Sequence, residues 1–253
     1  MKTYLYLALF LLTILGVSCS KERGCKDEQS INYNPDAELP DNSCRYPTIQ
    51  IAVDLRWGNV PFENNRIYNL AGYNTAIKNF ECLLSEFELI DFATSKTIQL
   101  LPKYHYLAAA NTDFGFGEIE LRQAQQLQFK VGLSANQNHV QSSILDSDTL
   151  LYWNATDGHV FLRLTGKVDR NGDGIPNENE AFDFEIGTDD LLQVINLPIN
   201  RIFKSTDETI MLKLDIKALL DGIDLQTQSS TQTTDNLPLA RQIADNMAGA
   251  FSY

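Results

Sequence analysis

From Thr48 onward, apolar and polar residues alternate with a period of two, and this alternation is the feature that most limits the fold. It is clearest in residues 49–55, 127–133, 182–186 and 210–214. Successive side chains of a β-strand point to opposite faces, so each of these segments is expected to bury one face. Turn residues separate the segments at short intervals, which favours strand-to-strand connections over βα units. We therefore predict an all-β, immunoglobulin-like antiparallel β-sandwich.

Some segments modify this pattern. Apolar residues occupy even positions up to Leu84 but odd positions from Phe87, and a bulge near Ser85 would return them to one face. Residues 226–236 contain no apolar side chain and are predicted to form a loop. Within residues 239–247, apolar side chains recur at every fourth position, which predicts a short amphipathic helix near the C-terminus.

The first nineteen residues resemble an export signal. Lys2 precedes an uncharged, mostly apolar run over residues 4–17, which is shorter than the roughly 20 residues that a membrane-spanning helix needs. The run ends in Leu15-Gly-Val-Ser-Cys19, which resembles a bacterial lipobox. We expect residues 1–18 to be a lipoprotein signal peptide and Cys19 to carry acyl chains that anchor the protein to a membrane of the cell envelope, facing the periplasm or exposed on the surface. The alternative is ordinary cleavage nearby, with Cys19 a plain thiol.

Two cysteines frame a polar, turn-rich segment. Cys25 and Cys44 bracket a sequence with too few apolar residues for a core of its own, and an oxidising compartment allows them to form a disulfide. Closing such a loop stabilises by about 3 kcal/mol in the chain-entropy model. The segment resembles a Cys-framed motif of secreted bacterial proteins with a central Asn-Tyr-Asn-Pro, here at 32–35, so we interpret residues 19–47 as a spacer. Cys82 lies among apolar neighbours and is predicted to be a buried, unreactive thiol.

Charge and motif content exclude some functions. The chain has 33 acidic and 20 basic residues, a formal net charge of −13. Binding a phosphate backbone needs a basic face, so no nucleic-acid partner is expected. The sequence contains no G-x-S-x-G, H-E-x-x-H or P-loop motif, and we predict no catalytic residues. A glycosidase that uses two carboxylates distant in sequence but close in the folded protein remains an alternative.

An acidic segment is the most specific local motif. Residues 169–180 match D-x-[DN]-x-[DN]-G-x₅-E at every constrained position. Calcium takes roughly six to eight oxygen ligands, which such a loop supplies from side chains and one backbone carbonyl. The expected ligands are Asp169, Asn171, Asp173, Ile175 through its carbonyl, Asn177 and Glu180. The flanks resemble strands, so we expect a structural ion in a hairpin turn; the alternative is a solvated acidic turn.

Several segments, taken in order, resemble the MbnP-like family of periplasmic or surface copper-binding proteins, which is named for a methanobactin-operon member. They are FECLLSEFEL at 80–89, residues 104–107, QFKVGL at 128–133, LYW at 151–153 with Gly158, LTG at 164–166, FDFEIG at 182–187 and IADN at 243–246 with Phe251. The resemblance covers residues 48–253 and implies a β-sandwich. In some members, copper is bound by histidine and by a tryptophan that a partner di-haem peroxidase has oxidised, so the resemblance also implies copper and such a partner.

The residues implied for copper depart from the family pattern. Trp153 is kept, but Ala155 replaces a second tryptophan, and His159 stands where the family has tyrosine. In a later strand, the expected histidine is Glu185. Copper prefers imidazole and thioether ligands over a carboxylate. The resemblance therefore implies at most an altered copper site around Trp153, His159 and Glu185.

Two functions follow from these features. The first is an exported, non-catalytic lipoprotein that binds metal, copper by resemblance and calcium through its own loop. The second is a cell-envelope binding or adhesion module in which calcium only stiffens the fold and copper has no role. A copper role predicts that His159 and Trp153 converge with another histidine. A binding module predicts an exposed apolar or aromatic patch near the loops, to which Trp57 and Phe62 are candidate contributors.

Overall fold

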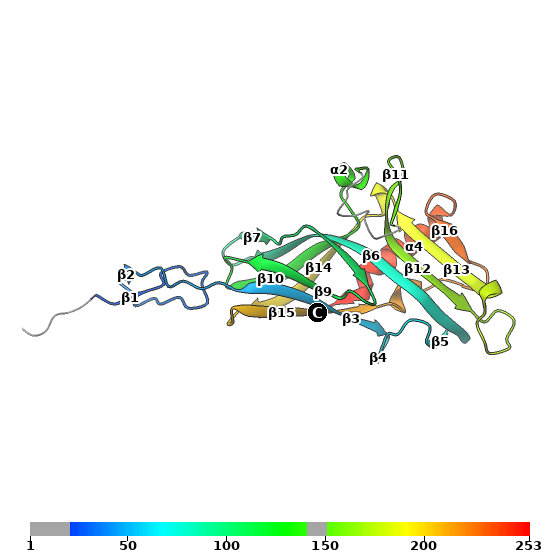
Figure 1. Ribbon diagram of the computed structural model, residues 1–253, viewed down its shortest axis with the longest axis horizontal. Helices are drawn as coiled ribbons and strands as arrows, with labels where there is room; N and C mark the ends of the chain where they lie inside the picture. Colours follow the sequence, from blue (N-terminus) through cyan, green and yellow to red (C-terminus); the bar gives the residue numbers. More distant parts are fainter. Residues whose placement is uncertain (1–20, 141–150) are drawn as a thin grey trace, which may run out of the picture.

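The computed structural model describes residues 21–140 and 151–253, which form two β-sheets packed as a sandwich with a helix near the C-terminus (Figure 1). The predicted signal peptide, residues 1–18, and the predicted lipidation site Cys19 lie outside the described residues. Within those residues, no helix is long and apolar enough to cross a membrane. The all-β sandwich that the alternation predicts is confirmed.

The larger sheet has ten strands, six of which follow the order β14-β10-β6-β12-β13-β16. These six are β6 (Tyr73–Asp91), β10 (Gln123–Val131), β12 (Gly158–Val168), β13 (Ala181–Gly187), β14 (Gln193–Ile202) and β16 (Ser230–Gln232). Four shorter strands pair with this path, namely β5 (Ile67–Leu70), β7 (Lys96–Gln99) and β8 (Tyr104–Ala108) along β6, and β11 (Tyr152–Asn154) along β12. Five strands therefore pair with the long strand β6.

The smaller sheet has five strands. They are β3 (Thr48–Trp57), β4 (Val60–Pro61), β9 (Asp113–Glu118), β15 (Asp207–Asp215) and β17 (Phe251–Ser252). Strands β3 and β15 pair in parallel, with Thr48 opposite Asp207 and Arg56 opposite Asp215. Most other pairs are antiparallel, as predicted. Period-two alternation shows which face of a strand is buried but not which way its neighbour runs, so it could not predict this parallel pair.

In residues 21–140 and 151–253, helices are few and short. They are α2 (Ala135–Asn138), α4 (Leu237–Ala250) and the 3₁₀ helices η1 (Glu178–Glu180), η2 (Asp189–Leu191) and η3 (Ala218–Leu220). The Asn236 side chain accepts a hydrogen bond from Leu239 N and so caps the start of α4. One face of α4, containing Leu239, Ile243 and Met247, is buried against the sandwich. The predicted C-terminal amphipathic helix is confirmed.

Side chains of both sheets and of α4 form one continuous apolar core. Phe129 of β10 stacks on Phe87 of β6 with ring centroids 4.8 Å apart, and it meets Phe251 of β17 edge-on at 5.1 Å. Trp57 and Phe62 belong to this core, with 6% and 9% of their surface exposed. They therefore contribute to packing and form no exposed aromatic patch.

The bulge predicted near Ser85 is present in β6. The pairing register with β10 shifts at this point. Glu86 has a φ of +50°, and its carboxylate accepts a hydrogen bond from Lys130 Nζ at 2.6 Å. Because the bulge inserts one residue, Leu84 and Phe87 are both buried although their positions differ in parity.

The polar segment 226–236 is not a loop throughout, and the prediction is wrong at its centre. Residues 230–232 form β16, which pairs in parallel with β13. Thr233 is buried; its hydroxyl accepts a hydrogen bond from Gly187 N and donates one to the Glu185 carbonyl, both at 2.9 Å. This strand is held by backbone hydrogen bonds to the sheet edge and by hydrogen bonds of side-chain hydroxyl groups. Neither kind of bond requires apolar residues.

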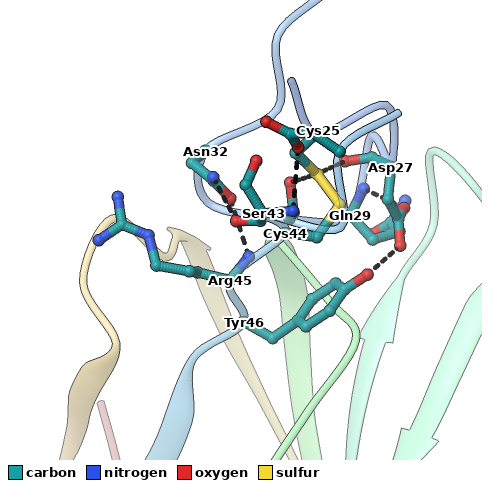
Figure 2. The surroundings of a disulfide bond; sticks show 10 residues. Cys25, Asp27, Gln29, Asn32, Ser43, Cys44, Arg45 and Tyr46 are labelled. Carbon is teal, nitrogen blue, oxygen red and sulfur yellow. Dashed lines mark hydrogen bonds between the residues drawn. A yellow bond between two sulfur atoms is a disulfide. The ribbon is translucent and has the colours of Figure 1, made fainter. Parts of the chain in front are cut away.

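A small module precedes the sandwich and projects from one end of it (Figure 1). Its strands β1 (Arg23–Gly24) and β2 (Leu39–Pro40) pair in parallel. The predicted disulfide between Cys25 and Cys44 is present, with the two Cα atoms 4.8 Å apart (Figure 2). Cys82 is free and buried, as predicted, and burial raises the pKa of its thiol.

Hydrogen bonds supplement the disulfide in this module (Figure 2). Asn32 Nδ2 donates to the Ser43 carbonyl, and Asn32 Oδ1 accepts from Arg45 N, both at 2.8 Å. The Tyr46 hydroxyl donates to Asp27 Oδ2 at 2.5 Å, and this hydrogen bond raises the pKa of Tyr46 to about 12. The module is thus held by a covalent link and polar contacts, with little apolar burial.

Replacing both cysteines, Cys25→Ser with Cys44→Ser, should unfold the module and leave the sandwich folded. The disulfide is worth about 3 kcal/mol, which is a large share of the stability of so small a unit. Amide hydrogen exchange should show lost protection at Asn34 N, which bonds to the Cys25 carbonyl, and unchanged protection in β6. Cys82→Ala is the control, since it removes a thiol from the sandwich alone. Equal loss of protection in β6 of the double variant would show that the two parts unfold together.

Candidate functional site

Strand β11 carries Trp153 to one end of the larger sheet, beside β13 and β16 (Figure 1). The indole Nε1–H of Trp153 donates to Glu185 Oε2 at 2.8 Å. Gly187 lies under the ring, because a Cβ at that position would come within 2.7 Å of Trp153 Cζ3 and within 2.4 Å of the His159 carbonyl. Glu185 and Gly187 of β13 therefore fix the orientation of the tryptophan.

Glu185 also faces a cation. Arg163 Nε lies 3.4 Å from Glu185 Oε1, within ion-pair distance, although this nitrogen makes no hydrogen bond. Arg163 lies opposite Glu185 in the β12–β13 ladder, and its other end is 3.8 Å from Asp183. Burial raises the pKa of Asp183. The Glu185 carboxylate thus contacts an indole N–H with one oxygen and a guanidinium with the other.

His159 has a different set of neighbours. It is buried, its ring lies 4.7 Å from that of Tyr152, and its Nδ1 is 2.7 Å from the Asn138 carbonyl oxygen. A carbonyl only accepts, so Nδ1 carries the proton. Asn138 Oδ1 also accepts from His159 N at 2.7 Å, and Asn138 Nδ2 donates to Asp189 at 2.8 Å. Asn138 therefore holds His159 through its own backbone carbonyl and through its side-chain oxygen.

The other two histidines lie in separate environments. His139 Nε2 is 3.2 Å from Asp189 Oδ2, and this hydrogen bond raises the pKa of His139. His105 packs among aromatic rings with its Nε2 3.0 Å from the Pro102 carbonyl, and burial lowers its pKa. Among the residues that the structure describes, no three His, Cys, Asp or Glu side chains are grouped so that they could hold a metal ion.

The residues present do not fit a copper site of the kind that the family resemblance implies. Copper favours imidazole and thioether donors, and the position expected to be histidine is Glu185. Its carboxylate already accepts from Trp153 and faces Arg163, whose positive charge opposes a bound cation. Met211 lies half-exposed on β15 and Met247 is buried in α4. The structure brings Trp153 and Glu185 together, whereas His159 is bound to Asn138.

The acidic loop predicted to bind calcium connects β12 to β13 at the end of β12 far from Trp153. Asp169 is 6% exposed, and its two oxygens accept from Gly172 N and Gly174 N at 2.8 and 2.9 Å. Glu180 is 5% exposed, and its Oε1 accepts from the amides of residues 170 and 171. The two end carboxylates are thus fixed by one short turn: each Asp169 oxygen accepts one of these hydrogen bonds and keeps a lone pair, whereas each Glu180 oxygen accepts two.

The central loop residues face their own backbone. Asp173 Oδ1 accepts from Ile175 N at 2.9 Å, and Asp173 Oδ2 accepts from Asn171 Nδ2 at 3.0 Å. Asn177 Nδ2 donates to Glu180 Oε2 at 2.7 Å. The six residues expected as calcium ligands therefore lie in one hydrogen-bonded turn, and their carboxylates are not gathered around a common centre.

A pocket of about 320 Å³ opens beside Trp153. It is lined by Trp153, Asn154, Asp157, Thr188, Gln232, Thr234 and Asp235. Apart from the tryptophan, none of these residues was predicted from the sequence to belong to a site. The available signal was weak, since small polar residues follow Trp153 and fill the segment 230–235, and such residues are equally typical of turns.

Two sheets packed around an apolar core, with a tryptophan fixed at one end of the larger sheet, define an all-β sandwich protein with an end-on site. The family model of MbnP matches residues 46–235, and the chain belongs to the MbnP family. Its fold is similar to that of MbnP from Methylosinus trichosporium, with a TM-score of 0.52 and 14% sequence identity over 72% of this chain and 80% of that one. No curated protein shows a significant sequence match.

Replacing Glu185 should release Trp153. In a Trp57→Phe background, which leaves Trp153 as the only tryptophan, Glu185→Ala should shift the fluorescence of Trp153 to longer wavelength, because the indole loses its acceptor and meets water. The free energy of unfolding should fall by about 1–3 kcal/mol, the cost of removing the carboxylate from the Trp153 N–H and from Arg163, which keeps only Asp183 as an acidic neighbour. Glu185→Gln is the matched control, since its amide oxygen still accepts from the indole. An unchanged emission in Glu185→Ala would contradict this role.

Proposed function

We propose that this protein is a cell-envelope lipoprotein that acts as a non-catalytic binding module, with a structural calcium ion in its β12–β13 turn and without a copper site. The observation that carries the proposal is the hydrogen bond from Trp153 to Glu185, with Arg163 on the other side of the carboxylate. These contacts use the residues that correspond to a copper site in the resemblance and leave a solvent-open pocket beside the tryptophan.

The envelope location is supported by two features of the N-terminal part. Cys19 ends a sequence that resembles a lipobox, and acyl chains on it would anchor the chain to a membrane. The Cys25–Cys44 disulfide is of the kind that persists in oxidising compartments such as the periplasm or cell surface. The module between Cys19 and the sandwich would act as a spacer that holds the binding site away from the membrane.

The calcium proposal is supported by the loop sequence and by its buried carboxylates. Asp169 and Glu180 are fixed on the same turn, which connects two neighbouring strands of the larger sheet. A hard cation would be held by their oxygens with those of Asn171, Asp173 and the Ile175 carbonyl. A bound ion would stiffen the hairpin, and binding to the folded state alone would raise the stability of the sandwich.

Metal content tests the proposal directly. The protein, purified without chelator, equilibrated with calcium and copper and then desalted, should retain about one calcium ion per chain and no copper by element-resolved mass spectrometry. Asp169→Ala with Glu180→Ala should abolish the retained calcium, whereas Asp189→Ala with Asp190→Ala, which removes two acidic residues outside the loop, should not. Retained copper that is lost on replacing His159 would refute the absence of a copper site.

The proposed absence of a copper site has a second consequence. We expect Trp153 to keep its mass after incubation with a di-haem peroxidase and oxidant, because its indole N–H is engaged by Glu185 and no copper site requires its oxidation. Peptide mass spectrometry of the tryptophan-containing fragment measures this, with Trp57 as the internal reference. A mass increase confined to Trp153 would support the copper role in place of the binding module.

A further inference from the structure

The pocket beside Trp153 combines one aromatic wall with four neutral hydrogen-bonding side chains and two aspartates. Its volume of about 320 Å³ is at the lower end of small-molecule sites. None of its lining residues is basic, and the tryptophan is the single aromatic residue among them. Within the described part of the chain, the side chains of Thr188, Gln232 and Thr234 have no hydrogen-bond partner of their own. Each can donate and accept, so together they present both kinds of group to a ligand.

The tryptophan is held so that its ring can serve as a platform. The indole N–H donates to Glu185, and the ring packs over Gly187. Its polar atom is therefore occupied, and what it offers to the pocket is its apolar ring surface. Such a surface packs against C–H groups, whose partial positive charge complements the negative face of the ring.

The opposite wall of the pocket, which includes Gln232 and Thr234, is hydrogen-bonded to β13. Thr233, between Gln232 and Thr234, accepts from Gly187 N and donates to the Glu185 carbonyl. Glu185 thus holds Trp153 through its side chain and β16 through its backbone. The two walls of the pocket are set at a fixed separation by two residues of β13.

Two of the eight non-glycine residues with positive φ in the described part of the chain lie at this pocket, and they are the two β-branched ones. Thr188 and Thr233 have φ values of +74° and +60°, in a region that β-branched residues rarely adopt. Thr188 lines the pocket, and Thr233 lies between two residues that do. Strained residues persist where the surrounding structure holds them and are typical of functional sites.

The acidic residues of the lining do not select a cation. Asp157 Oδ2 accepts from Asn154 Nδ2 at 2.7 Å, and Asp235 Oδ1 accepts from Gln232 N at 2.8 Å and from the Thr231 hydroxyl. One oxygen of each carboxylate is therefore already engaged by neighbouring donors. Recognition of an organic cation uses several aromatic faces, and only Trp153 supplies one here. An anion would face two carboxylates and no basic residue.

We propose that this pocket binds a neutral saccharide ring, with one C–H face on Trp153 and its hydroxyl groups on Thr188, Gln232, Thr234 and Asp235. This inference rests on the proposed function as a binding module and names its ligand class. A sugar ring has the required combination of an apolar face and a rim of donors and acceptors, and it carries no charge. In a cell envelope, such rings occur in N-acetylated glycans and in unacetylated glucans, which share this chemistry.

Saturation-transfer NMR on the full chain tests the proposal, in a detergent without a sugar headgroup and with N,N′-diacetylchitobiose and cellobiose as separate probes. At least one probe should bind, with a dissociation constant on the order of 1 mM for so open a site. Preference for the first would indicate an N-acetylated glycan and preference for the second an unacetylated glucan. No transfer to either sugar overturns the proposal.

Matched variants locate the binding. Gln232→Ala with Thr234→Ala should weaken it about tenfold or more, because two hydrogen-bonding groups are lost. Thr97→Ala with Gln99→Ala is the control, since it removes the same residue types from exposed positions of β7 at the other end of the sheet (Figure 1). Trp153→Ala should abolish binding, and unchanged amide exchange in β6 would show that each variant is folded. Binding that survives both the Gln232→Ala with Thr234→Ala change and the Trp153→Ala change overturns the proposal.

Two further outcomes separate this inference from the proposed function. Tetramethylammonium should not displace the sugar or bind in its place; binding at Trp153 by that cation overturns the saccharide assignment. A protein that retains calcium, holds no copper and binds neither sugar would refute the saccharide site alone. A protein that retains copper through His159 would refute the proposed function itself.

Discussion

Burial of one face of β6 against the smaller sheet is the interaction on which the rest of the structure depends. Five strands pair with β6, and its apolar side chains meet those of β3, β15 and α4 in a single core. The bulge at Glu86 is part of this constraint, because in a regular strand Leu84 and Phe87, three residues apart, would point to opposite sides. Once this face is buried, the positions of β12, which is next to β6, and of β13 beyond it follow from pairing.

The end of β13 converts this scaffold into a site. Glu185 binds the Trp153 indole with its side chain and Thr233 with its carbonyl, and Gly187 leaves room for the ring. A carboxylate at this position can accept from an indole and pair with Arg163, neither of which an imidazolium could do. Under the proposed function, this substitution replaces an expected copper ligand with an anchor for Trp153, whereas Thr233 is held by the backbone carbonyl that any residue at this position supplies.

Local patterns predicted much of the fold. Alternation predicted the sandwich, the change of parity near Ser85 predicted the bulge, and the cysteine spacing predicted the disulfide, because each depends on residues close in sequence or on one covalent bond. Strand β16 was not predicted, because backbone hydrogen bonds to β13 hold it. Such bonds require no particular pattern of side chains. The contacts of His159 with Asn138 and of Trp153 with Glu185 were likewise not predicted, because each joins segments distant in the chain.

The sequence by itself determined which faces of the strands are buried, where the covalent link of the spacer lies, and that the loop at 169–180 is rich in oxygen ligands. These properties are encoded residue by residue, through hydropathy, cysteine chemistry and side-chain type. Only the tertiary structure decided the parallel pairing of β3 with β15, the partner of Glu185 and the pocket between β11 and β16. Each of these joins segments distant in the chain, and their contact is set by how the two sheets pack as a whole.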